Sequence, residues 1–62
     1  MSKELTVIIK DDDKTCKQKF LIYDNFTMKE DDPTVAECIR LSKENFKGSP
    51  DSIQLRCLMV IQ

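Results

Sequence analysis

Few side chains in this 62-residue chain could bind a metal or attack a substrate. The sequence has no histidine, which is the commonest general base and the commonest metal ligand in proteins. Its three cysteines, Cys16, Cys38 and Cys57, are spread along the chain, whereas a closed zinc site takes four ligands that usually come in close pairs. On the elements predicted below, all three thiols fall on the side that faces the core. We therefore expect three reduced, buried thiols and no metal site.

Two acidic runs could be mistaken for catalytic or calcium-binding groups. The run 11–13 lacks the glycine and the distant glutamate of a calcium loop, which favours a solvated turn. The run 30–32 stands directly before Pro33, where it is explained by the start of a helix. The only glycine, Gly48, excludes a glycine-rich phosphate loop. We find no convergent group of titratable residues, and we predict no catalytic residue, no bound cofactor and no enzymatic activity.

Positive side chains gather around the first predicted hairpin and could approach nucleic acid as a β-ribbon. They are Lys10, Lys14, Lys17 and Lys19, to which Tyr23 and Arg56 could be added. The acidic run 11–13 lies in the same hairpin and cancels much of this field, and the whole chain has a net charge of -1. Lysines on a sheet edge also serve to discourage aggregation. Nucleic acid is therefore the less favoured partner.

The elements that must position these residues begin with two strands. Residues 3–10 alternate β-branched side chains, with Leu5, Val7 and Ile9 on one face. After a turn rich in aspartate, a second strand runs from residue 16 to about residue 23. Phe26 and Met28 are apolar at alternate spacing, so this strand either ends near residue 24 or resumes beyond it.

A helix follows, because Asp32 can cap its first amides and Pro33 fits its first position. Its apolar stripe consists of Val35, Cys38, Ile39, Ser42 and Phe46, widened by Ala36 and Leu41. Gly48 is predicted to take the left-handed conformation that closes the helix. The segment 51–62 then forms the last strand.

These elements predict a single small α+β domain over residues 1–62, in the order β-β-α-β, with one helix packed on one face of a three-stranded, mainly antiparallel sheet. The strand order is either 2-1-3 or 1-2-3. We favour 2-1-3 because the continuous apolar run Val7-Ile8-Ile9 is typical of a central strand.

One helix covers one face of such a sheet, which leaves apolar side chains uncovered on the other. They are Ile8, Leu21, Tyr23, Leu58 and Val60. We predict that these five residues form the interface of a homodimer, either face to face or edge to edge. The alternatives are simple exposure of these side chains and a different protein partner.

The sequence thus predicts a small, non-enzymatic protein-interaction module. It contains no long apolar stretch for a signal peptide or a membrane span, which favours the cytoplasm and no membrane partner. The alternative function is a small inhibitor or adaptor that blocks a larger host protein. In length and layout the chain resembles small accessory proteins of phages and mobile elements, although no motif carries this resemblance.

Overall fold

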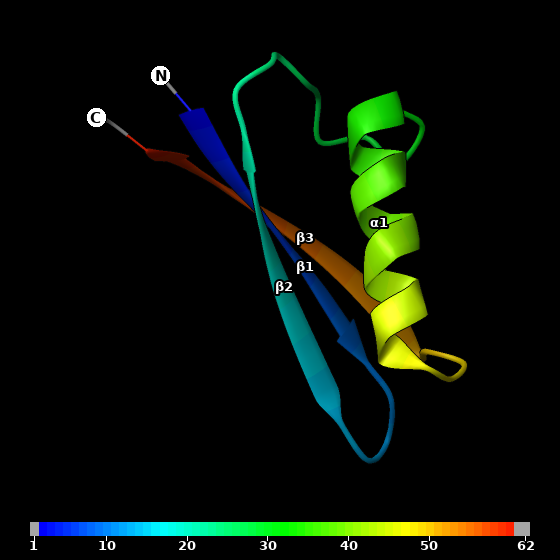
Figure 1. The fold of residues 1–62 in the computed structure, drawn as a ribbon. Coiled ribbons are helices and arrows are strands. Elements are labelled where there is room, and N and C mark those ends of the chain that lie inside the picture. Colours follow the sequence, from blue (N-terminus) through cyan, green and yellow to red (C-terminus); the bar gives the residue numbers. More distant parts are fainter. Residues whose placement is uncertain (1, 61–62) are drawn as a thin grey trace.

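The structure is a computed structural model that describes residues 2–60, with only the backbone described at residue 60. Its elements are β1 (Ser2–Lys10), β2 (Thr15–Ile22), α1 (Pro33–Phe46) and β3 (Ser52–Val60). The strands form one antiparallel sheet in the order β2-β1-β3 (Figure 1). The predicted α+β class, the element order and the favoured strand order are confirmed.

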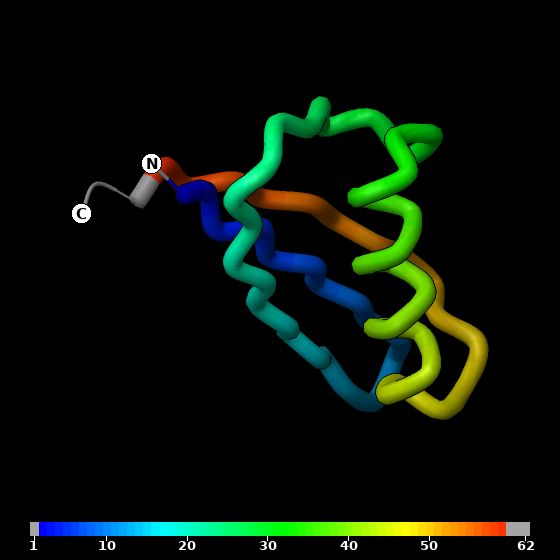
Figure 2. The backbone as a smooth tube through the Cα atoms, turned by 45° about the horizontal axis from the view of Figure 1, so that its top comes forward, coloured from blue at the N-terminus to red at the C-terminus, as the bar shows by residue number. Residues whose placement is uncertain are grey.

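The central position of β1 explains its unbroken apolar run. In Figure 2 the blue β1 segment runs between β2 and β3. Leu5 pairs with Phe20 on β2 and with Cys57 on β3, and Val7 pairs with Gln18 and Leu55. A central strand has neighbours along both sides, so its side chains are buried on both faces of the sheet. Residues 5–9 are all buried.

The turn between β1 and β2 is held by Asp11. Its Oδ1 accepts hydrogen bonds from the backbone amides of Asp13 at 2.7 Å and Lys14 at 2.8 Å. The Asp11 amide donates to the carbonyl of Lys14 at 3.0 Å. This carboxylate therefore organises a local turn, as the sequence predicted.

The start of α1 is capped by Asp32. Its Oδ1 accepts from the amide of Thr34 at 2.9 Å, and Pro33 occupies the first turn, as predicted. Its Oδ2 accepts from the amide of Thr27 at 2.9 Å and from the Thr27 hydroxyl at 3.2 Å. The same carboxylate thus ties the preceding loop to the helix, and residues 23–32 contain no strand.

The C-terminal end of α1 differs from the prediction by one residue. Lys47, with φ of 56°, takes the left-handed conformation that was assigned to Gly48. The Lys47 amide donates to the carbonyl of Lys43 at 3.4 Å, which closes the helix directly after Phe46. The β1–β2 turn meets this end, because Lys14 Nζ donates to the carbonyl of Phe46 at 2.6 Å and lies 4.4 Å from the centroid of its ring.

The core lies between α1 and the sheet. Its buried members are Leu5, Val7, Ile9, Val35, Cys38 and Phe46. The helix lies closer to one side of the sheet: its Cα atoms come within 8 Å of those of β1 and β2, and not of those described in β3. Ala36, predicted to widen the buried stripe, is exposed for this reason. The position of α1 decides which surfaces stay open.

Candidate functional site

The face of the sheet opposite α1 carries one set of alternating side chains from each strand, which we call the open face. The strand register arranges most of them in three rows across the sheet. These rows are Leu21–Glu4–Leu58, Lys19–Thr6–Arg56 and Lys17–Ile8–Gln54. No helix or loop among residues 2–60 covers this face (Figure 1).

The apolar residues predicted as an interface do not form one continuous patch on the open face. Ile8 has an exposed fraction of only 3%, because it lies on the central strand beside Lys17 and Gln54. Leu21 and Leu58 are exposed at 48% and 64%, but Glu4 lies between them in their row. The expected cluster is therefore divided by a carboxylate.

The two remaining predicted interface residues lie at the margins. Tyr23 follows the last residue of β2 and is 70% exposed. The side chain of Val60 lies outside the part of the chain that the structure describes. Membership of all five residues in an interface therefore stays a prediction, and among the four whose side chains are described Leu21, Tyr23 and Leu58 are exposed.

The open face instead brings together positive side chains that are far apart in the sequence. A groove of about 460 Å³ contains Lys17 and Lys19 from β2 and Arg56 from β3, above Thr6 and Ile8 of β1. Glu4 contributes one carboxylate, whose Oε1 lies 4.0 Å from Lys19 Nζ. These three cations belong to the positive set predicted from the sequence, and the strand register brings them together on one face, whereas Lys14 bonds the end of α1.

The second open region is β3 itself. It is an edge strand with β1 on one side. On the α1 side of the sheet Ile53 and Leu55 are half-buried, but Cys57 is exposed and Met59 has an exposed fraction of 59%. The expectation that Cys57 would be buried is wrong, because α1 does not extend over this strand.

The other two thiols lie closer to the core. Cys38 is buried and Cys16 is half-buried. Burial, and then the nearby charge of Glu37, raises the pKa of the Cys38 thiol, which keeps it protonated and unreactive. Within the described residues no group of three or more histidine, cysteine, aspartate or glutamate side chains is arranged to hold a metal ion.

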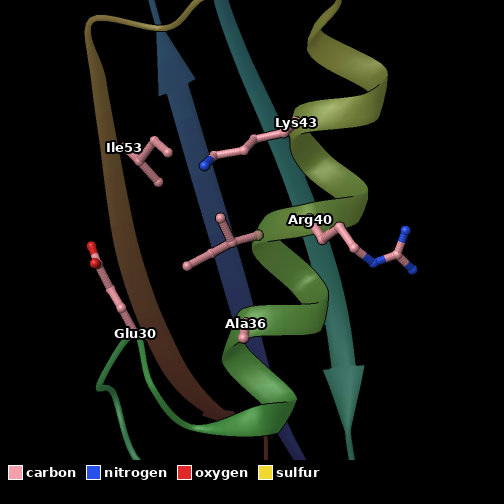
Figure 3. Close-up of a pocket in the computed structure, with 6 residues that line it drawn as sticks. Glu30, Ala36, Arg40, Lys43 and Ile53 are labelled. Carbon is pink, nitrogen blue, oxygen red and sulfur yellow. The ribbon is translucent and has the colours of Figure 1, made fainter.

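A shallow groove of about 320 Å³ separates α1 from β3. Figure 3 shows Ile53 on β3 facing Ala36 and Lys43 of α1, with Glu30 at one end. Ile39 forms part of its lining. The groove is the space left by the off-centre position of the helix, and it exposes the α1 side of β3.

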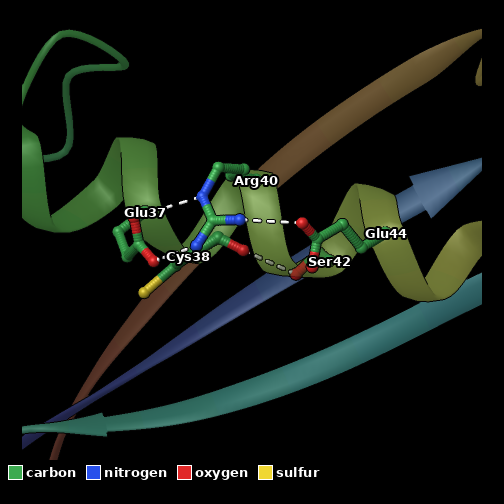
Figure 4. Close-up of polar contacts among 5 residues, drawn as sticks. All are labelled: Glu37, Cys38, Arg40, Ser42 and Glu44. Atoms are coloured by element: carbon green, nitrogen blue, oxygen red, sulfur yellow. Dashed lines mark hydrogen bonds and ion pairs between the residues drawn. The ribbon is translucent and has the colours of Figure 1, made fainter.

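Three charged residues on the outer surface of α1, Glu37, Arg40 and Glu44, pair with one another. The Arg40 guanidinium donates to Glu44 Oε1 at 2.7 Å, and it also bonds both carboxylate oxygens of Glu37 (Figure 4). The hydrogen bond from Arg40 lowers the pKa of the Glu37 carboxyl and raises that of the guanidinium. Beneath this network the Ser42 hydroxyl donates to the carbonyl of Cys38 at 2.9 Å. Arg40 is thus flanked by its own counter-ions.

In comparisons with protein-family models, curated proteins and solved structures, no significant match to this chain was found. Among the helices that the structure describes, none combines the length and the apolar character needed to cross a lipid bilayer. Among the described residues, the position of α1 leaves open the basic groove of the open face and the outer edge of β3.

Proposed function

We propose that this protein is a non-enzymatic interaction module that forms a homodimer through the edge of β3. The observation that carries the proposal is the exposure of β3 on both faces. Leu58 is exposed on the open face and Met59 on the opposite face, while α1 lies over β1 and β2. An edge strand also presents backbone donors and acceptors without a ladder partner on its outer side.

The other edge strand, β2, is less suited to pairing. Its sequence carries Lys17 and Lys19, and charged lysines on an edge strand oppose the addition of a further strand. β2 is also linked to the helix, because Asn45 Nδ2 donates to Gln18 Oε1 at 2.8 Å. On β3 the described positive residue is Arg56 alone. The asymmetry between the edges favours β3.

Face-to-face association of two open faces is disfavoured by charge. It would place Lys17, Lys19 and Arg56 of one subunit against the same basic groove of its copy. Bringing like charges together while removing water from around them is costly. Edge pairing leaves these cations in solvent and satisfies backbone groups instead.

A two-fold axis perpendicular to the sheet would pair β3 with its copy in an antiparallel ladder. With Cys57 at this axis, Arg56 lies opposite Leu58 of the partner subunit, and Leu55 lies opposite Met59 of the partner subunit. This register avoids a direct pair of arginines and joins the two sheets into one of six strands. The proposal places the module in the cytoplasm, where its thiols stay reduced.

The experiment is a measurement of molar mass by light scattering during size-exclusion chromatography, over a wide range of protein concentrations. One chain has a mass of 7.2 kDa. We expect twice this mass at high concentration and a reversible fall toward the monomer on dilution. A molar mass of one chain at every concentration would rule out the proposed homodimer.

A further inference from the structure

We propose that the basic groove of the open face is a docking site for an acidic amphipathic helix of another protein. The groove is shaped by Lys17, Lys19 and Arg56 around a floor of Thr6 and Ile8, with Leu58 beside them. The groove shares Arg56 and Leu58 with β3, but the proposed homodimer uses the outer backbone edge of that strand and leaves the open face free, so the inference goes beyond the proposed homodimer.

The charge of the open face is opposite to that of the whole protein. Strand alternation adds Lys10 to the three cations of the groove, and Glu4 is the one carboxylate described on this face. The chain as a whole has a net charge of -1, and the acidic run 11–13 lies in the turn between β1 and β2, so the excess of positive charge is confined to the strand residues of this face. A partner with carboxylates is therefore attracted to this face in particular.

Backbone chemistry favours a helix as the occupant. The hydrogen-bonding groups of a sheet point along the plane of the sheet, toward neighbouring strands, and the face offers side chains only. A segment that lies on the face must therefore satisfy its own backbone donors and acceptors, and a helix does this. Packing of a helix on the free face of a sheet is also a standard layer arrangement in α+β proteins.

The mixed lining of the groove favours a protein over nucleic acid. Leu58 is 64% exposed at one end of the groove and offers an apolar contact, whereas the cations lie toward the other end. An amphipathic helix can present apolar side chains and carboxylates together. The described lining contains no aromatic side chain on which the bases of a single strand could stack.

A second copy of this chain does not supply the required helix. The apolar stripe of α1 is occupied by its own core, through Val35, Cys38 and Phe46. Its acidic residues Glu37 and Glu44 are already bonded to Arg40 (Figure 4). The helix α1 of a second copy is therefore not a suitable occupant.

The test uses the full chain and a synthetic peptide with leucines at helical spacing and glutamates along both flanks. A peptide with glutamine at every glutamate position and a single-stranded oligothymidylate serve as comparison probes. Binding is followed by isothermal titration calorimetry, and amide chemical shifts identify the surface. We expect the acidic peptide alone to bind, to shift the amides of β1 and β2 around the groove, and to weaken with added salt.

Lys17→Glu tests the groove directly, with Lys29→Glu as the matched control in the exposed loop before α1. We expect Lys17→Glu to weaken peptide binding about tenfold and Lys29→Glu to change it by less than about twofold. Circular dichroism checks that both variants are folded. If Lys17→Glu is unfolded, Arg56→Gln replaces it as the groove variant. The inference is overturned by absence of binding, by equal binding of the glutamine peptide, by tighter binding of the oligothymidylate, or by equal losses in the groove and loop variants. The mass measurement for the homodimer is independent of these outcomes.

Discussion

Leu21 and Leu58 lie in one row across the sheet, on either side of Glu4, because the register pairs Glu4 with both of them. Both leucines are on the open face, and both are exposed. They differ in the strand that carries them, since Leu21 is on β2 and Leu58 is on β3. The chain thus contains a matched pair of residues, one at each edge of the sheet.

This pair can locate the homodimer interface. We expect Leu58→Arg to shift the molar mass toward that of one chain, because the register proposed above would put its guanidinium opposite Arg56 of the partner subunit at two symmetric positions. Leu21→Arg should leave the dimer intact. Dissociation by both variants would indicate face-to-face association instead, and dissociation by Leu21→Arg alone would indicate pairing through β2.

The position of α1 predicts unequal reactivity of two thiols. Cys57 is exposed, whereas Cys38 is buried and burial raises the pKa of its thiol. In the Leu58→Arg variant, where dimerisation should not shield β3, we expect a soluble thiol reagent to modify Cys57 first. Cys38 should react more slowly, by up to about a hundredfold, because its exposure requires unfolding and a small domain has limited stability. Mass spectrometry of digested samples measures both rates, and equal rates would contradict the off-centre packing of α1.

Lys14 links the β1–β2 turn to the end of α1 through its bond to the Phe46 carbonyl and its contact with the Phe46 ring. We expect Lys14→Met to lower the free energy of unfolding by about 1–2 kcal/mol, since it removes a charged hydrogen bond and a cation–π contact. Urea denaturation measures this loss. Lys17→Met, on the open face, is the control and should have a smaller effect. Similar losses in the two variants would show that the Lys14 contacts do not stabilise the fold.

Asp32 should make the stability of the protein depend on pH. The backbone amide of Thr27, together with that of Thr34, lowers the pKa of the Asp32 carboxyl below its ordinary value of 3.8. A lowered folded-state pKa means that the stabilisation is fully present above the unfolded-state pKa and is lost as pH falls through the folded-state pKa. Wild-type stability should therefore decrease below about pH 3.8.

We expect Asp32→Asn to lower the urea midpoint at neutral pH, because the amide nitrogen cannot accept the bond from Thr27. The difference from wild type should shrink as the pH falls below 3.8. Asp31→Asn is the control, because Asp31 is an exposed neighbour that lies outside the hydrogen bonds accepted by Asp32. A wild-type–Asp32→Asn difference that is constant from neutral to acidic pH would show that the Asp32 charge is not responsible.

Local sequence patterns predicted the elements because their causes are local. The turn at Asp11 and the helix start at Asp32 depend on side chains that bond amides a few residues away. The apolar run Val7-Ile8-Ile9 predicted the central strand correctly, although the edge strand β3 carries a longer apolar run from Cys57 onward, so such a run does not by itself fix the strand order. The end of the helix was misplaced by one residue because either Lys47 or Gly48 could take the left-handed conformation.

The surfaces depended on where α1 lies across the sheet, and no periodicity in the sequence contains that position. The apolar stripe identified which side of α1 faces the sheet, yet the same stripe fits over β1 and β2 or over β1 and β3. Tertiary packing placed α1 on the β2 side, which buried Cys38 and exposed Cys57 and Met59. The register likewise put Glu4 between two leucines and three cations in one groove. Such surfaces arise from residues distant in sequence, and only the folded chain sets the distances between them.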